Sequence, residues 1–407
     1  MAAPRPRRAS TDPGDEVAGG QPSAGAPRED IVDGRVAEGR LAATRQVLSA
    51  EGLDPRVTCE VRTGDLPSGW PWAVLCGLEE ALSLLEGRDV DAVAVPEGSV
   101  IYPEEPVLQI SGRYLAFVEL ETALLGTLGP ATGVATAAAH LKMAAEGRPV
   151  SPMGLGRLHP SVVPVVERAA YVGGCDAVAT AIGAGLTGSG TVSPPGPDLS
   201  LLLGEPEAWL AFDRHVDGTV PRLVTVGILD DERTTAVAAA DALEDHLAAV
   251  HVEAPSTEPS RLVHLVRELR WELDAGGRSD VRILVSGDLD EGLVNRLAHR
   301  VDGFRIGLPL TAAPVVTFSF DIVEVEGEAR SRRGTLSGRK TLWRCEACGN
   351  RGIAPARAGL EPCPRCEGRL RSLLTPRLRW GTRDERPPEA SAIRARALKE
   401  AAEAPSA

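Results

Sequence analysis

The stretch AVHVEA (249–254), PSRLVHLVRELRWELDAG (259–276) and VRILVSG (281–287) decides the fold of this chain. Its two short runs are almost continuously apolar, whereas the segment between them has helical length and carries apolar residues at helical spacing. Strands of this kind, separated by helices, are typical of a parallel sheet that helices cover. We therefore predict an α/β domain in this part of the chain.

The same alternation continues on both sides of this stretch. Because many strand–helix units follow one another, it favours a barrel over an open sheet, and it predicts that ligands bind at the C-terminal ends of the strands. The further elements that we expect are strands CDAVATA (175–181), RLVTVGIL (222–229) and VDGFRIG (301–307), and a helix AVAAADALEDHLAA (236–249).

The first third of the chain has a different pattern. A helical segment at 77–87 lies among three short β-like runs, which predicts a small α+β domain. Two helices follow, at 114–129 and 133–147, and each ends in glycine. A late strand, FSFDIVEVEG (318–327), is placed to rejoin this first sheet. The three early runs are VTCEVR (57–62), VDAVAVP (90–96) and PVLQISG (106–112).

Length and composition limit the number of domains and the class of protein. The chain has 407 residues, enough for two or three domains, and 43% hydrophobic residues exclude a fibrous or wholly disordered protein. No apolar run reaches the roughly 18 residues of a membrane span, and the start lacks the apolar stretch of a signal peptide. We expect a soluble, cytoplasmic protein with no membrane partner. Residues 1–32 are predicted to be a disordered tail, and the polar chain after Asp384 a tail with a short surface helix.

Charge is distributed unevenly along the chain. The formal net charge is -13, which argues against nucleic-acid binding because phosphates are also negative. Residues 330–383, however, carry fourteen arginines and lysines against three acids. We interpret this basic segment as a solvated face, or as a surface that meets acidic residues of a partner subunit, rather than as a nucleic-acid site.

Four of the seven cysteines form two CxxC pairs. Fourteen residues separate Cys345 and Cys348 from Cys363 and Cys366, and four thiolates at this spacing can hold a tetrahedral Zn²⁺. Such a site has no position left for substrate, so its role would be structural. Disulfides are not expected in a cytoplasmic chain, and an iron–sulfur site is less usual in this compact arrangement. The other cysteines lie in apolar runs and are expected to be buried thiols: Cys59, Cys76 and Cys175.

Five strings in collinear order, between about residues 33 and 370, resemble the nicotinate phosphoribosyltransferase family. The resemblance is greatest to the archaeal-type branch, which has a cysteine-rich C-terminal domain. The strings are VPEGSVIYPEEPVLQISGRYLAFVELETALLG (95–126), GRLHPSVVPVVERAAYVGG (156–174), VRELRWELDAGG (266–277), VSGDLDEG (285–292) and APVVTFSFDIVEVEGEARSRRGTLSGRK (313–340).

This resemblance implies a type II phosphoribosyltransferase fold, in which an irregular α/β barrel accompanies a split α/β sandwich and a small zinc-ribbon-like module. Members usually form homodimers. The family joins nicotinate to phosphoribosyl pyrophosphate in NAD biosynthesis, giving nicotinate mononucleotide and pyrophosphate. ATP hydrolysis drives this reaction, and Mg²⁺ accompanies the pyrophosphate. The implied boundaries are 33–113 for the first part of the sandwich, 114–317 for the barrel, 318–340 for the segment returning to the sandwich, 341–370 for the zinc module and 371–407 for the C-terminal segment and tail.

Several family motifs are altered near the expected ligands. Where the family reads TD-x-YF-x-RT, with a tyrosine that stacks on nicotinate, this chain has AEGRLAAT (37–44), which puts Arg40 at the tyrosine position. The motif G-x-RR-x-HP retains Arg157 and His159 but has lost its first arginine. The motif GT-x-x-H retains Thr191, whereas Pro194 replaces the histidine through which ATP hydrolysis is coupled.

Changes also fall at the ends of the predicted barrel strands. Thr225 stands where the family has an acid, His251 replaces an arginine, and Glu253 conservatively replaces an aspartate. The SGD string at 286–288 fits the family's phosphate loop, because short residues let backbone N–H groups approach an anion. The loop's companion GVGT reads RIGL here. The resemblance therefore implies catalytic positions Arg157, His159 and Thr191, and substrate- or phosphate-binding positions Arg40, Glu253, Ser286, Gly287, Asp288, Arg305 and Gly307.

Three hypotheses follow from this combination of kept architecture and altered contacts. The chain could perform the family's nicotinate reaction with substitute residues. It could transfer a ribosyl or phosphoribosyl group to a different acceptor. It could also be a non-catalytic binding or regulatory homologue.

Overall fold

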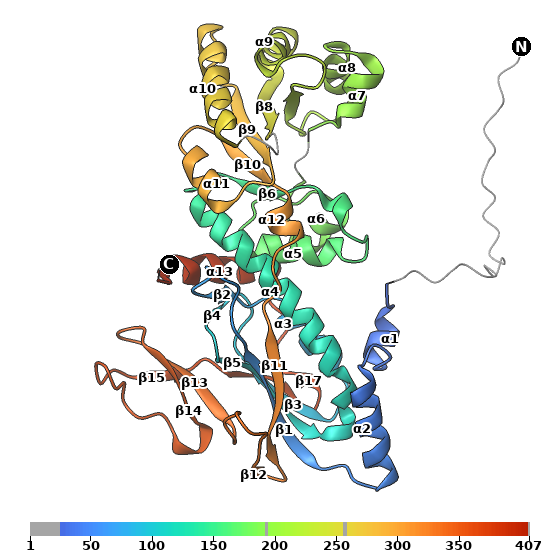
Figure 1. Ribbon diagram of the computed structural model, residues 1–407, viewed down its shortest axis with the longest axis vertical. Coiled ribbons are helices and arrows are strands. Elements are labelled where there is room, and N and C mark those ends of the chain that lie inside the picture. The colour runs from blue at the N-terminus through green and yellow to red at the C-terminus, as the bar shows by residue number, and fades with distance from the viewer. Residues whose placement is uncertain (1–24, 192–193, 255–258, 406–407) are drawn as a thin grey trace, which may run out of the picture.

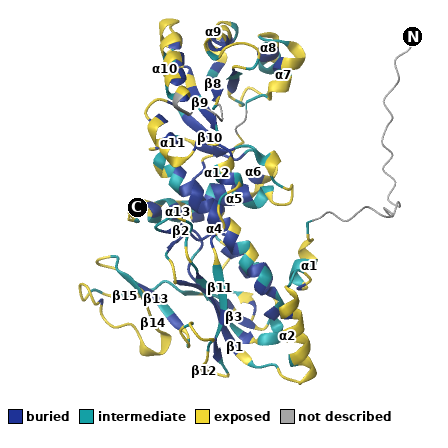
Figure 2. Ribbon diagram, in the orientation of Figure 1, coloured by how far each residue is buried: buried dark blue, intermediate teal, exposed yellow. Residues whose placement is uncertain are grey.

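The computed structural model describes residues 25–191, 194–254 and 259–405. An antiparallel sheet and a parallel sheet lie at opposite ends of an elongated molecule, and helix α4 (Glu121–Ala144) runs beside both (Figure 1). Each end has its own hydrophobic core, and buried residues follow α4 and the strands of both sheets (Figure 2). The predicted tail at 1–32 lies mostly outside the described residues, and its last five residues form helix α1 (Arg28–Val32).

The first sheet has seven strands in the order β12-β11-β1-β5-β3-β16-β17. Strand β11 pairs antiparallel with β1, from Val57 opposite Val325 to Thr63 opposite Phe318, and this pairing completes a split sandwich. Strand β16 pairs with β3, so the chain beyond residue 370 returns to the sheet a second time, which we had not predicted. The strands are β1 (Arg56–Thr63), β3 (Val90–Ala94), β5 (Pro106–Arg113), β11 (Phe318–Val325), β12 (Glu328–Ala329), β16 (Thr375–Arg379) and β17 (Thr382–Arg383).

The second sheet has five strands, all parallel, in the order β6-β10-β9-β8-β7. Its buried apolar residues share one core with helices α9, α10 and α11, which confirms the predicted helix-covered parallel sheet. The strands are β6 (Val150–Pro152), β7 (Arg222–Val226), β8 (Leu247–Glu253), β9 (Arg282–Gly287) and β10 (Gly303–Ile306).

The predicted strand at 175–181 is wrong. This segment makes a single bridge, between Val178 and Thr191, and belongs to no named strand. The carboxylate of Asp176 accepts a hydrogen bond from the Val150 N–H at 2.9 Å, and the side chain of Thr180 caps the next helix by accepting from the Gly183 N–H. These two polar anchors turn the chain before a strand can extend.

The two helices predicted between residues 114 and 147 are one helix, α4, with Pro130 inside it. We had interpreted its internal glycines as helix ends. A Cβ on Gly133 would lie 2.1 Å from the carbonyl oxygen of Pro314, and one on Gly129 would lie 2.9 Å from that of Val316. These glycines therefore let another backbone segment approach the helix closely instead of ending it.

The predicted C-terminal helix is confirmed, but its placement as a surface helix is wrong. Helix α13 (Ala390–Glu403) buries Ile393, Ala397 and Ala401 in the core of the parallel-sheet end. The other helices are α2 (Gly39–Ala50), α3 (Leu78–Leu85), α5 (Val163–Gly173), α6 (Ala181–Thr187), α7 (Pro197–Leu203), α8 (Glu207–His215), α9 (Glu232–Leu243), α10 (Pro259–Ala275), α11 (Glu291–Leu297) and α12 (Leu308–Thr311), with short 3₁₀ turns at Tyr114–Ala116, Val118–Leu120, Leu155–Arg157, Glu244–His246 and Ala356–Ala358.

The cysteine-containing segment forms a separate three-stranded sheet of β13 (Lys340–Cys345), β14 (Arg351–Pro355) and β15 (Leu370–Ser372). A two-stranded sheet joins β2 (Ala73–Val74) to β4 (Val100–Ile101). No helix in the described ranges is both long enough and apolar enough to span a membrane.

The basic segment 330–383 meets acidic residues of its own chain. Lys340 lies 3.0 Å from Glu60, and Arg351 lies 2.7 Å from Glu105. We had expected a solvated face or a partner's acids, and that interpretation is wrong for Lys340 and Arg351, whose side chains are 6% and 14% exposed. Further pairs of this kind are Arg332–Asp321, Arg339–Glu324, Arg344–Glu403, Arg377–Glu79 and Arg383–Glu79.

Candidate functional site

A row of polar side chains crosses the parallel sheet near the C-terminal ends of its strands. The strand register places Glu253 of β8 beside Ser286 of β9, Ser286 beside Arg305 of β10, and Arg305 beside Ser151 of β6. Adjacent residues in register point to the same face of a sheet, so these four side chains share one face, opposite the apolar core residues. Ligands of parallel α/β folds bind at this edge.

His251 lies two residues before Glu253 on the same face of β8. Its Nδ1 is 3.1 Å from the hydroxyl oxygen of Thr225 on β7. Burial lowers the pKa of His251 to about 3, and the charge of Arg305 acts in the same direction. His251 is therefore neutral at physiological pH.

Some buried polar atoms in this region have no hydrogen-bond partner among the described residues. They include Nε2 of His251 and Oγ of Ser286, in side chains that are 4% and 0% exposed. Arg305 beside them is also buried; desolvation lowers the pKa of its guanidinium, and the carboxylate of Glu253 acts in the opposite direction. The polar row thus combines one buried cation, Arg305, one acid, Glu253, and the hydroxyls of Ser151 and Ser286, with His251 on the same face of β8.

Arg157 and Asp288 meet at the same edge of the sheet. Nη1 of Arg157 lies 2.7 Å from Oδ1 of Asp288, and that oxygen also accepts the Leu308 N–H at 2.8 Å. The hydrogen bond from Arg157 holds the pKa of Asp288 below its usual range. A Cβ on Gly307 would lie 2.4 Å from Oδ1 of Asp288, so a larger residue there would force the Asp288 side chain to shift. The N–H of Gly307 donates to the carbonyl of Gly287 at 2.8 Å, which joins the two loops.

His159 and Thr191 do not join this cluster through any hydrogen bond or ion pair to Arg157 or Asp288 within the described part of the chain. Both side chains are exposed. Nδ1 of His159 accepts the N–H of Ser161 at 3.2 Å, a local loop contact. Thr191 follows Gly190, whose carbonyl accepts the Val178 N–H at 3.3 Å. The histidine position of the family motif is Pro194, which has no side-chain group to carry a phosphoryl.

Arg40 lies on helix α2, beside the antiparallel sheet and away from the parallel sheet (Figure 1). Its guanidinium pairs with Glu38 at 2.9 Å and with the buried carboxylate of Glu121. It lines a cavity of about 520 Å³ that Tyr114 and Phe320 also line. The structure thus provides aromatic side chains next to the position where the family's tyrosine is absent, a feature that sequence analysis missed.

The four paired cysteines converge in the small sheet. Their Sγ atoms all lie within 4.8 Å of one another; Cys345 is 3.5 Å from Cys366, and Cys348 is 3.7 Å from Cys363. Both distances are too long for disulfides, whose sulfurs lie about 2.05 Å apart. They are close to the roughly 3.8 Å edge of a tetrahedron with metal–sulfur bonds of about 2.3 Å. The cluster can therefore hold a structural metal ion.

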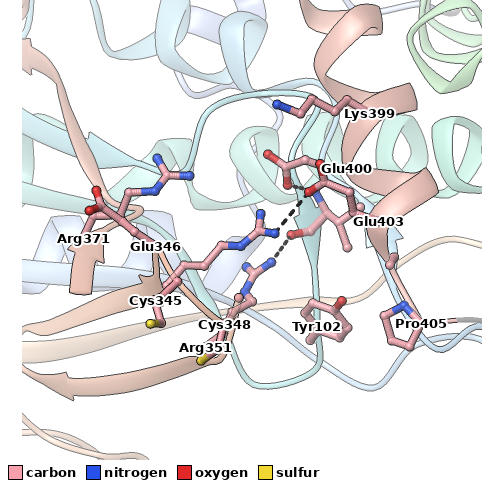
Figure 3. Close-up of a pocket in the computed structure, with 15 residues that line it drawn as sticks. Tyr102, Cys345, Glu346, Cys348, Arg351, Arg371, Lys399, Glu400, Glu403 and Pro405 are labelled. Atoms are coloured by element: carbon pink, nitrogen blue, oxygen red, sulfur yellow. Dashed lines mark hydrogen bonds and ion pairs between the residues drawn. The ribbon is translucent and has the colours of Figure 1, made fainter. Parts of the chain in front are cut away.

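The cysteine module also forms one wall of a cleft of about 660 Å³, whose opposite wall includes the end of α13 (Figure 3). Arg344 reaches across to Glu403 at 3.2 Å, and Arg351 donates to the carbonyl of Val100 at 2.8 Å. The guanidinium of Arg351 lies over the Tyr102 ring at 4.9 Å. These contacts fix the module against the rest of the chain.

Comparisons with known proteins agree with this architecture. A sequence profile described as the N-terminal domain of quinolinate phosphoribosyl transferase matches residues 38–132. The crystal structure of nicotinate-nucleotide pyrophosphorylase from Pyrococcus furiosus superposes with a TM-score of 0.90 and 39% sequence identity, covering 94% of this chain and 98% of that one. This chain belongs to the nicotinate/quinolinate phosphoribosyltransferase family.

Two further family members are more distant. The nicotinate phosphoribosyltransferase pncB1 of Mycobacterium tuberculosis (strain ATCC 25618 / H37Rv) is 32% identical over 270 residues. The match covers 63% of this chain and 59% of that protein, less than two thirds of the relative's length. Human nicotinic acid phosphoribosyltransferase, with a TM-score of 0.72 at 19% identity, shares the fold.

Within this phosphoribosyltransferase fold, the site positions derived from the sequence fall into three groups. The first and largest group lies at the C-terminal edge of the parallel sheet. The second is Arg40, which lies beside the sandwich. The third is His159 and Thr191, which lie in exposed loops. His251 had been recognised only as a replaced arginine. The sequence signal that could have identified it is a histidine two residues before the end of a predicted parallel strand, on the strand face that carries Glu253. The first group comprises Arg157, Glu253, Ser286, Gly287, Asp288, Arg305 and Gly307.

Proposed function

We propose that this protein catalyses phosphoribosyl transfer between phosphoribosyl pyrophosphate and a pyridine carboxylic acid, with nicotinate as the first acceptor to test. The observation that carries the proposal is the convergence of Arg157, Asp288, Gly307, Ser286 and Arg305 at the ligand-binding edge of the parallel sheet. The high similarity to the Pyrococcus protein over nearly its whole length supports the same reaction class.

In this reaction the pyridine nitrogen forms a bond to C1 of the ribose while the bond from C1 to the pyrophosphate oxygen breaks. Positive charge then develops on the sugar and negative charge on the leaving pyrophosphate. Arg157 and Arg305 are the cations at the proposed site that would stabilise phosphate oxygens. We propose that the carboxylate of Glu253 accepts a hydrogen bond from a ribose hydroxyl. Mg²⁺ would accompany the pyrophosphate.

We propose that ATP hydrolysis is not coupled through residue 194. Proline lacks a nucleophilic group, so the phosphoryl transfer that the family's histidine performs has no acceptor there. The reaction would then be driven by removal of pyrophosphate. His159 and Thr191 are proposed to border the site from its exposed loops.

Arg40 can contribute to the proposed site only in a dimer, in which it comes from the second chain. Within one chain it lies beside the sandwich, at the other end of the molecule from the parallel sheet (Figure 1). We propose a homodimer in which the cavity of Arg40, Tyr114 and Phe320 faces the sheet edge of the second copy. The two aromatic rings would then take over the stacking role of the missing tyrosine.

A non-catalytic binding role is the second candidate, and one observation favours it. Asp288 already neutralises Arg157, and Glu253 opposes Arg305, so the edge is nearly balanced in charge. Phosphoribosyl pyrophosphate is strongly anionic and would gain little from a balanced surface.

The deciding experiment incubates the purified full chain with nicotinate, phosphoribosyl pyrophosphate and Mg²⁺, with and without ATP, and measures nicotinate mononucleotide. We expect turnover in both conditions and its loss in Arg305→Ala. Absence of product under conditions in which an active family member works would refute the proposal and favour the binding role.

We further propose that the four-cysteine cluster holds one structural Zn²⁺. The closed set of four sulfur donors suits zinc and leaves no position for substrate. Metal analysis of protein purified without chelators should find one zinc per chain. The double variant Cys345→Ser, Cys363→Ser should lose it; zinc retained in that variant would show that other residues bind the metal.

A further inference from the structure

Three arginines form a row across the small cysteine-containing sheet. Arg344 of β13 is in register with Arg351 of β14 on one side and with Arg371 of β15 on the other, so the three side chains lie on one face. Like charges directly opposite each other on neighbouring strands destabilise a sheet. We therefore expect negative groups to lie against this face.

The rest of the chain supplies acidic partners for two of the three arginines. Arg351 lies 2.7 Å from Glu105, and Arg344 lies 3.2 Å from Glu403 of α13. Arg371 is exposed and forms no ion pair with any residue that the structure describes. The third position of the row is therefore the one without a negative partner.

Arg371 lines a cavity together with further cations. This cavity has a volume of about 390 Å³, and Arg396 and Lys399 of α13 also line it. Arg371 and Lys399 extend from opposite walls, one on the cysteine-containing sheet and the other on α13 (Figure 3). Among the described residues Lys399 has no acidic partner either, and Arg396 donates to the carbonyl oxygen of Glu97 at 2.5 Å. The cysteines line the neighbouring cleft but not this cavity.

The acids of this cavity are already engaged. Glu403 pairs with Arg344, and Glu400 accepts the N–H of Val100 at 2.9 Å. Four cations and these two acids line the cavity, so it has an excess of two positive charges in a chain whose net charge is -13. Cations that lie together in a cavity repel one another unless an anion balances them.

We propose that this cavity binds the phosphate group of a small molecule between Arg371 on one wall and Arg396 and Lys399 on the other. A phosphate group carries about 1.5 to 2 negative charges at neutral pH and has three strong acceptor oxygens. Arginine can donate two parallel N–H groups to such oxygens, and lysine adds a compact charge. The bound phosphate does for Arg371 what Glu105 and Glu403 do for the other two arginines. No residue of the proposed transfer site lines this cavity, so the inference is independent of that reaction.

Calorimetric titration of the full chain with inorganic phosphate and, separately, with methyl phosphate tests the site. Every protein in the series carries Arg157→Met, so that phosphate bound at the edge of the parallel sheet contributes little. Adding Arg371→Met or Lys399→Met should weaken binding about tenfold, because each removes a charged hydrogen-bond donor. Arg333→Met is the matched control, since Arg333 is an exposed arginine of the same basic segment and lines neither cavity; it should change binding by less than about twofold.

Weaker binding in both variants supports a site between the two walls. Lys399 lies outside the cysteine-containing sheet, so its variant cannot act by unfolding that sheet. Tighter binding of methyl phosphate identifies a phosphate ester as the ligand, and tighter binding of inorganic phosphate identifies the free ion. Unchanged binding in either variant, an equal loss in Arg333→Met, or no binding of either probe would overturn the site. These outcomes do not depend on formation of nicotinate mononucleotide, so they are distinct from failure of the proposed function.

Discussion

Lys340 and Glu60 form a buried ion pair that holds the returning segment of the chain to the sandwich. Their side chains are 6% and 1% exposed, and Nζ of Lys340 lies 3.0 Å from Oε1 of Glu60. The amide of Gln109 donates both to Glu60 and to the carbonyl of Lys340, at 3.0 and 2.8 Å. We predict that Lys340→Met destabilises the protein strongly at neutral pH, because it leaves the Glu60 carboxylate buried without its cation.

The size of this effect should depend on pH. Removing one partner of a buried pair costs about 3 to 5 kcal/mol. Burial already raises the pKa of Glu60, although Lys340 lowers it, so the folded pKa must rise further in the variant. A carboxyl group whose pKa is higher in the folded than in the unfolded state destabilises the folded state at high pH. This penalty is complete above the folded pKa, and it disappears as the pH falls below the unfolded pKa. The loss should therefore be largest near pH 8 and smaller near pH 5.

Urea unfolding at both pH values, followed by circular dichroism, measures the free energy of unfolding. Lys399→Met is a matched control, because Lys399 is exposed and makes no ion pair within the described chain; its effect should stay within about 0.5 kcal/mol. The double variant Glu60→Gln, Lys340→Met should recover most of the stability. A loss below about 1 kcal/mol at pH 8, or an equal loss at both pH values, would refute the argument.

Two further predictions test the site and the helix that joins the two ends. Asp288→Asn should bind pyrophosphate about fivefold more tightly in a calorimetric titration, because it removes a repulsion of about 1 kcal/mol between charges roughly 4 Å apart in a water-like environment. Asp280→Asn, the same change at the opposite edge of the sheet, should have no effect. Equal gains in both variants would contradict a pyrophosphate site beside Asp288. Gly133→Ala should lower the free energy of unfolding, since its Cβ would lie 2.1 Å from the carbonyl oxygen of Pro314. Gly126→Ala in the same helix has open space and should raise the free energy of unfolding by up to about 1 kcal/mol. Thermal or urea unfolding that ranks the two variants in the opposite order would contradict this packing.

The parallel sheet could be predicted from sequence because its strands are short apolar runs separated by helices, a pattern set by burial along the chain itself. Helix α4 could not, because its glycines look like helix ends until the backbone at 314–316 is seen to pack on them. The segment 175–181 has the composition of a strand, yet the hydrogen bonds of Asp176 and Thr180 turn it away. In both cases, contacts between distant residues override the local pattern.

In the candidate site, too, some features could be predicted from the sequence and others depend on contacts between distant residues. Family motifs identified Arg157, Asp288 and Gly307 separately, and their loops do meet. No pattern along the chain indicates that the carboxylate of Asp288 forms an ion pair with the guanidinium of Arg157. The sequence could not predict the buried Nε2 of His251 either, because the burial of His251 and its contact with Thr225 depend on the pairing of β7 with β8.

The pairing of β16 with β3 has a consequence for synthesis of the chain on the ribosome. The side chain of Thr375 donates to the carbonyl of Ala94, a contact between residues 281 positions apart. The edge of β3 therefore stays uncovered until residues 375–379 have emerged, and Glu79 lacks its two partners until Arg377 and Arg383 have emerged. An uncovered edge strand is a template for pairing with other chains. Nascent chains in which β16 has not yet been made are thus more exposed to aggregation than the folded protein, and β16 protects the edge of β3 once it has paired.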